Sequence, residues 1–187
     1  MALTQCFCAG LLRESSRRAF GWVLESAKPE TCWRAIHTYR EVPPLPGSNT
    51  PDLPNPRQSF GSPQGRTLLL GIATDEAQTP SERALALNYL FFNLWPQPAR
   101  RGAQLSPPNA VEHARIIRAL VPLLKSKAPT VRENAANALR WVDASDYLNR
   151  ALKARAALPA LQAALQAEAV PSTRQAMAFA ISEIQTP

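Results

Sequence analysis

The second half of the chain repeats a pair of helix-like segments, and this repeat limits the fold more than any other feature. An apolar run at 120–124 returns at 161–165, and the amphipathic segment at 130–142 returns at 173–184. A weaker copy begins at Pro80. Repeats of about 20–50 residues are typical of stacked helical units, because one helical hairpin cannot bury its own apolar faces. The repeat therefore predicts an all-α stack.

The second segment of each copy has the spacing of one buried helix face. In the best copy, the positions i, i+3, i+4 and i+7 are Ala135, Ala138, Leu139 and Val142. The alanines allow neighbouring helices to approach closely, and the leucine fills the space between them. Alanine is abundant in this half and the chain has only 7 glycines, a balance that favours helix over sheet.

In the segment 120–142, leucines are followed by a Val131-Arg132 pair that opens the second helix, and then by spaced alanine and leucine. This pattern resembles a HEAT repeat of the armadillo-like helical family. The resemblance extends over about 66–187 and implies a short right-handed α-α superhelix, an alpha solenoid, of about three HEAT-like helical hairpins. Ser126 stands where the family has a turn aspartate, so a regular Asp–Arg ladder between repeats is in question. The alternative fold is an irregular helical bundle.

The rest of the chain divides into two further regions. Residues 1–42 form an N-terminal helical segment, with helices expected over 9–27 and 29–42. These helices either pack on the main domain or stand apart from it. Residues 43–65 contain seven of the 18 prolines and predict an extended, proline-rich linker. The HEAT-like repeat domain then occupies 66–187.

Residues that support catalysis or metal binding are scarce. The two histidines, His37 and His113, do not lie at ligand spacing with the three cysteines, Cys6, Cys8 and Cys32. The sequence also lacks a serine–histidine–acid set and a glycine-rich phosphate loop. We therefore expect a protein that is not an enzyme and that has no metal site and no cofactor.

A stripe of amide and aromatic side chains follows the expected second helices. In stacked helical repeats these helices line the concave surface where partners dock, and tryptophan is enriched at binding hot spots. The predicted function is a non-catalytic scaffold or adaptor that binds a protein partner on this face. The alternative interpretation is that the aromatic residues simply pack between repeats. The candidate residues are Asn88, Phe92, Asn134, Asn137, Trp141 and Phe179.

A basic stretch at 100–155 predicts a second kind of partner. It holds 11 basic and 4 acidic residues, whereas the whole chain has a net charge of +7. Such an excess attracts nucleic acid, so the alternative function is a nucleic-acid-binding helical-repeat protein; a solvated helix face is the simpler explanation. The candidate basic patch consists of Arg115, Arg118, Lys125, Lys127, Arg132 and Arg140.

The N-terminus and the hydropathy pattern bear on location. No run approaches the roughly 18 apolar residues that cross a bilayer, so no transmembrane segment is expected. The expected compartment is the cytoplasm. Arg13, Arg17 and Arg18 beside Ser15 and Ser16 make a mitochondrial presequence the alternative. The sequence leaves the oligomeric state open.

Overall fold

The computed structural model describes residues 28–41, 57–94, 109–142 and 154–185, and all regular structure within these ranges is helical. The elements are α3 (Pro29–Glu41), α4 (Arg57–Phe60), α5 (Pro63–Thr74), α6 (Pro80–Leu94), α7 (Ala110–Leu120), the 3-10 helix η1 (Val121–Lys125), α8 (Pro129–Val142), the 3-10 helix η3 (Ala154–Ala157), α9 (Leu158–Ala167) and α10 (Pro171–Gln185).

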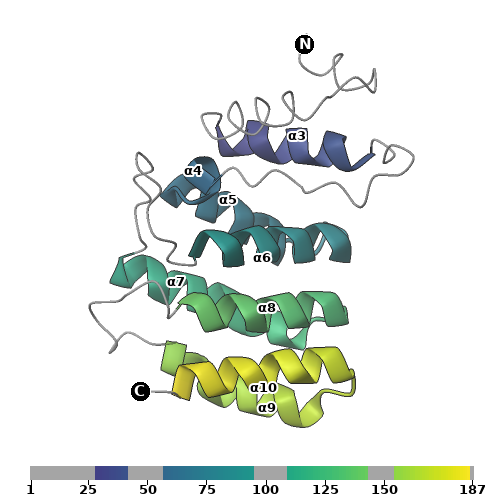
Figure 1. Ribbon diagram of the computed structural model, residues 1–187, viewed down its shortest axis with the longest axis vertical. Helices are drawn as coiled ribbons and strands as arrows, with labels where there is room; N and C mark the ends of the chain where they lie inside the picture. Colours follow the sequence, from purple (N-terminus) through teal and green to yellow (C-terminus); the bar gives the residue numbers. More distant parts are fainter. Residues whose placement is uncertain (1–27, 42–56, 95–108, 143–153, 186–187) are drawn as a thin grey trace, which may run out of the picture.

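The helices form a stack of three hairpins along the long axis of the molecule (Figure 1). Each hairpin pairs a first helix with a second: α5 with α6, α7 and η1 with α8, and α9 with α10. The second helices α6, α8 and α10 also pack directly on one another, while α3 crosses the N-terminal end (Figure 1). This arrangement confirms the predicted all-α stack of about three hairpins.

Proline fixes the start of many helices. Its missing N–H would have no partner in the first turn, and its φ already suits a helix. Five of the described helices begin at a proline, namely Pro29, Pro63, Pro80, Pro129 and Pro171.

Polar side chains complete other helix starts. The Ser62 hydroxyl accepts from the Gly65 amide at 3.0 Å, and the Asn109 side chain accepts from the Glu112 amide at 2.9 Å. At the start of α6, Thr79 and Glu82 form a reciprocal capping box. These caps satisfy amides that have no partner within the helix.

The core lies between the two helix layers, where the repeat predicted it. Ala135, Ala138 and Leu139 are fully buried on α8, and Met177 and Ala180 are fully buried at matching positions of α10. Ile181 is only partly buried against the core. The small side chains at 135 and 138 explain how α8 packs closely on both α6 and α10.

The N-terminal end of the stack is covered by a helix whose placement the sequence left open. The helix expected over 29–42 does pack on the main domain, because α3 contacts α4 and α5 and buries Cys32 completely. The ring centroid of Trp33 is 6.5 Å from that of Phe60 and 6.5 Å from that of Tyr89, which it meets edge-on. The expected helix over 9–27 lies outside the described residues.

The linker predicted over 43–65 extends too far, since α4 and α5 begin at Arg57 and Pro63. Phe60 is fully buried. A Cβ on Gly65 would lie 2.1 Å from the Ser59 carbonyl oxygen, so this glycine permits close packing of α4 on α5. Pro63 therefore starts a helix and Gly65 allows a close contact between helices, whereas the sequence predicted an extended chain at both positions. Residues 43–56 lie outside the described ranges.

Two bidentate ion pairs join successive hairpins. Arg66 of α5 donates from Nε and Nη2 to the Glu112 carboxylate of α7, at 2.8 Å in both cases. Arg132 of α8 donates to both oxygens of Glu168, in the turn before α10, at 2.6 and 2.7 Å. In both pairs the carboxylate comes from the following hairpin, but the arginine lies on a first helix in one pair and on a second helix in the other.

The arginine that repeats in the second helices has one role in all three hairpins. It donates to a main-chain carbonyl near the end of the first helix of its own hairpin, where helical carbonyls have no partner. The pairs are Arg83 with Ala73 at 2.9 Å, Arg132 with Ser126 at 2.8 Å, and Arg174 with Glu168 at 3.0 Å. The sequence repeat at these arginines thus reflects a repeated closure of the hairpin turn.

Candidate binding surface on the second helices

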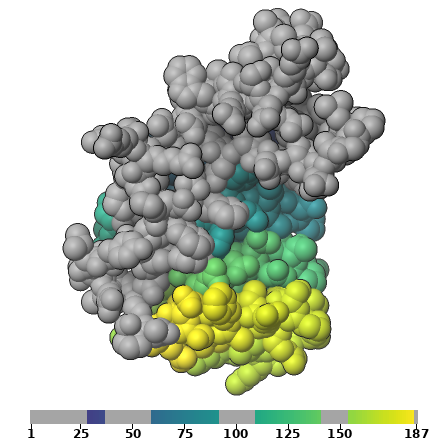
Figure 2. Space-filling model, viewed as in Figure 1, coloured from purple at the N-terminus to yellow at the C-terminus, as the bar shows by residue number. Residues whose placement is uncertain are grey.

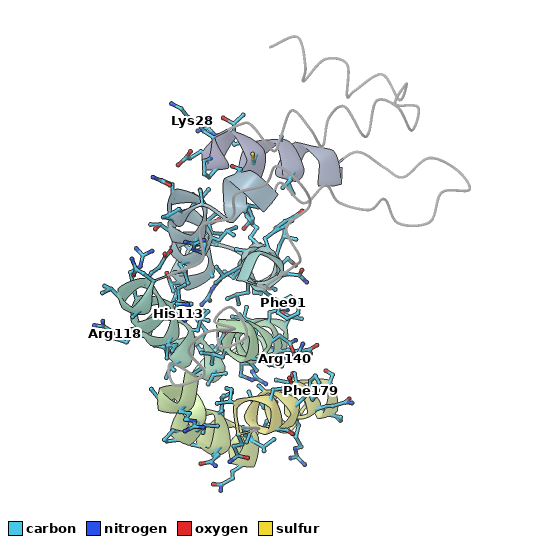
Figure 3. All side chains as sticks on the ribbon, turned by 60° about the vertical axis from the view of Figure 1, so that its left-hand side comes forward. Lys28, Phe91, His113, Arg118, Arg140 and Phe179 are labelled. Atoms are coloured by element: carbon cyan, nitrogen blue, oxygen red, sulfur yellow. The ribbon has the colours of Figure 1, made fainter. Side chains whose placement is uncertain are left out.

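The second helices bring three side chains from distant parts of the sequence into one column. Phe91 of α6, Arg140 of α8 and Phe179 of α10 lie one above another on the same side of the stack (Figure 3). His113 and Arg118, both of α7, lie on the opposite side (Figure 3). The column spans all three hairpins.

Arg140 lies between the two aromatic rings. Its guanidinium carbon is 4.4 Å from the Phe179 ring centroid and 5.7 Å from that of Phe91. Cations are attracted to the faces of aromatic rings at such distances. Burial lowers the pKa of Arg140, and the charge of Glu183 opposes this effect. At the outer end of the column, Phe179 keeps 50% of its surface exposed.

A shallow groove of about 550 Å³ runs along α10 beside this column. Figure 2 shows α8 and α10 side by side at the surface in this part of the molecule. The Ser172 hydroxyl donates to the Glu133 carboxylate across the two helices at 3.0 Å. The residues that line the groove are Glu133, Ser172, Gln175, Ala176, Ala178 and Phe179.

The structure describes four of the six residues in the predicted stripe. Asn88 is exposed on α6, and Asn134 and Asn137 are half-buried on α8. The Asn134 amide donates within its own helix to the Thr130 carbonyl at 2.8 Å. Of these four residues, Phe179 lines the groove.

The other two stripe residues, Phe92 and Trp141, lie in α6 and α8, but their side chains are outside the described part of the molecule. The stripe also omitted Phe91 and Glu133. Glu133 lies seven residues before Arg140, which is a same-face spacing on a helix. That spacing is a signal by which the sequence could have identified Glu133.

The six residues of the predicted basic patch are not gathered into one patch. Arg115 and Arg118 are exposed on the first helix α7, and Arg115 donates to the Thr67 hydroxyl at 2.8 Å. Lys125 and Lys127 are exposed at the turn before α8.

Arg132 is bound to Glu168, and Arg140 lies between aromatic rings. Arg118 and Arg140 are on opposite sides of the stack (Figure 3). The basic stretch is divided in this way because it crosses from the first helix to the second helix of one hairpin.

The described residues contain no group of three or more His, Cys, Asp or Glu side chains that could hold a metal ion. His113 is buried on α7, while the His37 side chain, Cys6 and Cys8 lie outside the described ranges. Burial raises the pKa of the Cys32 thiol. None of the described helices is long and apolar enough to span a membrane.

One comparison with known proteins matches the chain. The family model of the Armadillo/beta-catenin-like repeat matches residues 110–140, which comprise α7, η1 and most of α8. No curated protein and no solved structure gives a significant match. The narrower resemblance to HEAT repeats stays a prediction. The middle hairpin of this all-helical stack is therefore similar to an armadillo-like repeat.

Proposed function

We propose that this chain is a non-catalytic protein-binding scaffold or adaptor whose partner docks on the face formed by α6, α8 and α10. The observation that carries the proposal is the groove along α10, which ends at the half-exposed ring of Phe179. Helical repeat proteins commonly bind partners on extended surfaces of this kind. The match of the middle hairpin to an armadillo-like repeat supports the same class of function.

The groove has the composition of a recognition surface. The Phe179 ring offers a large apolar area that a partner can cover, and aromatic anchors dominate many interfaces. The exposed side chains of Ser172 and Gln175 offer hydrogen-bonding groups beside it. Arg140 holds the ring from behind, so little side-chain freedom is lost when a partner binds.

A matched pair of substitutions tests the proposal. Phe179 and Val111 are both exposed large apolar residues, but Phe179 is on the second helix α10 and Val111, 78% exposed, is on the first helix α7. The full-length chain and its Phe179→Ala and Val111→Ala variants are used to capture proteins from an extract of the native cells, with quantification by mass spectrometry.

We expect Phe179→Ala to reduce capture of a specific partner by about thirtyfold, as for a hot-spot aromatic residue. Val111→Ala should capture it as the wild type does. Equal capture by all three chains would overturn the proposal.

A further inference from the structure

The groove on α10 is chemically different at its two ends. At the start of α10, Ser172 and the carboxylate of Glu133 form one wall. Seven residues later, the Phe179 ring forms the other end. Ala176 and Ala178 line the groove between the two ends.

The Glu133 end carries a net negative charge. Of the described residues that line the groove, Glu133 is the only charged one. Its neighbour along the chain, Arg132, is bound to Glu168. Arg140 lies about two helical turns away, between the rings at the other end. A partner that covered Glu133 with apolar atoms would remove this carboxylate from water without compensation, which is costly.

The length of the groove limits the spacing of the groups that can fill it. Seven residues of an α-helix rise about 10 Å. A segment in the extended polyproline II conformation advances about 3.1 Å per residue, and every third side chain returns to the same face. Two side chains about three residues apart in an extended segment therefore reach both ends of the groove.

We infer that the groove binds an extended segment of a protein partner in which a lysine or arginine lies about three residues from a large apolar side chain. The cation pairs with Glu133, and the apolar side chain packs on Phe179. This inference rests on the proposed function and adds the chemistry of the partner to it.

Selection from a library of random short peptides displayed on phage, with the full-length chain as bait, tests the inference. The enriched peptides are then synthesised with a fluorophore, and their affinities are measured by fluorescence anisotropy. The variants are Glu133→Gln, Glu133→Lys and Phe179→Ala. Glu76→Gln and Glu76→Lys are the matched controls, because Glu76 is an exposed glutamate in the turn after α5. Circular dichroism confirms that each variant is folded.

We expect the enriched peptides to share a basic residue about three positions from a large apolar one. Glu133→Gln should weaken their binding by about three- to tenfold, and the Glu76 variants should not. A peptide in which the basic residue is replaced by glutamate should bind Glu133→Lys better than it binds the wild type, because the charges are exchanged.

The outcomes separate the inference from the proposed function. If Phe179→Ala weakens binding but Glu133→Gln does not, the inference is overturned and the docking face stands. If the peptides bind all variants equally, both are overturned. A selection that enriches no peptide, or only peptides without a basic residue, also overturns the inference.

Discussion

Arg132 and Arg140 lie about two turns apart on α8, and the two ends of this helix have different surroundings. Arg132, near the start, makes a bidentate ion pair with Glu168, whose side chain is only 2% exposed. Arg140, near the end, contacts the faces of Phe91 and Phe179 beside an open groove. One arginine pairs with a buried carboxylate of the next hairpin, whereas the other contacts rings of both neighbouring hairpins, one of them half-exposed.

Basic residues on the same helix of a stack can therefore have different roles. A carboxylate from the neighbouring hairpin neutralises Arg132, so this arginine contributes to stability and little to the surface. Arg140 instead contacts two aromatic rings beside the groove, where burial lowers its pKa and the charge of Glu183 opposes this effect. The predicted basic patch combined the two because sequence position alone does not reveal the partner of an arginine.

The largest expected effect is on stability at the start of α8. Glu168→Gln removes the charge that neutralises Arg132 in a buried site, and breaking a buried pair in this way costs about 3–5 kcal/mol. Urea denaturation followed by circular dichroism measures the loss in the free energy of unfolding. Glu76→Gln, at an exposed glutamate in the turn after α5, is the control and should change it by less than about 0.5 kcal/mol. Equal effects would show that the pair does not hold the hairpins together.

The same ion pair should make stability depend on acid. The hydrogen bonds from Arg132 lower the pKa of Glu168 from 4.5 to about 2. The hydrogen bonds from Arg66 also lower the pKa of Glu112.

The pKa of Glu168 is lower in the folded protein than in the unfolded chain, so the unfolded chain binds more protons between pH 4.5 and about 2. The contribution of Glu168 is complete above pH of about 4.5 and is lost as the pH falls toward 2. Denaturation between these pH values should show a weaker pH dependence in Glu168→Gln than in the wild type. An unchanged dependence would contradict the assigned pair.

The smallest stability effect is expected at the end of α8. Arg140→Ala removes two contacts between a cation and aromatic rings, which contribute about 1–2 kcal/mol together. Urea denaturation should therefore show a smaller loss for Arg140→Ala than for Glu168→Gln. The reverse order would mean that the column of Phe91, Arg140 and Phe179, and not the ion pair, is the main tie between hairpins.

The fold was predictable because its determinants are local or repeated. The spacing of Ala135, Ala138 and Leu139 identifies a buried helix face without knowledge of what covers it. The prolines at 80, 129 and 171 identify helix starts through their own geometry. The predicted linker was too long because proline and glycine are typical of linkers and also of other sites. Here Pro63 starts a helix, and Gly65 lies at a close contact between helices.

The site was only partly predictable, because its residues meet through the stacking of hairpins. Phe91, Arg140 and Phe179 come from three helices, and no local pattern identifies which of Phe91 and Phe92 faces Arg140. Glu168 is 36 residues from Arg132, so the pair depends on the register between two hairpins. Phe179 was named as a candidate because its position repeats within the second helices, and the structure places its ring at the groove.

The proposed protein partner lies on the face formed by α6, α8 and α10. Photo-crosslinking tests it directly, with p-benzoylphenylalanine placed at Gln175 in the groove or, in a matched chain, at Val111 on α7. We expect Gln175 to crosslink to a defined partner protein, Phe179→Ala to abolish this product, and Val111 not to give it. The same product from Val111, or its persistence in Phe179→Ala, would show that the partner does not dock on the face formed by α6, α8 and α10.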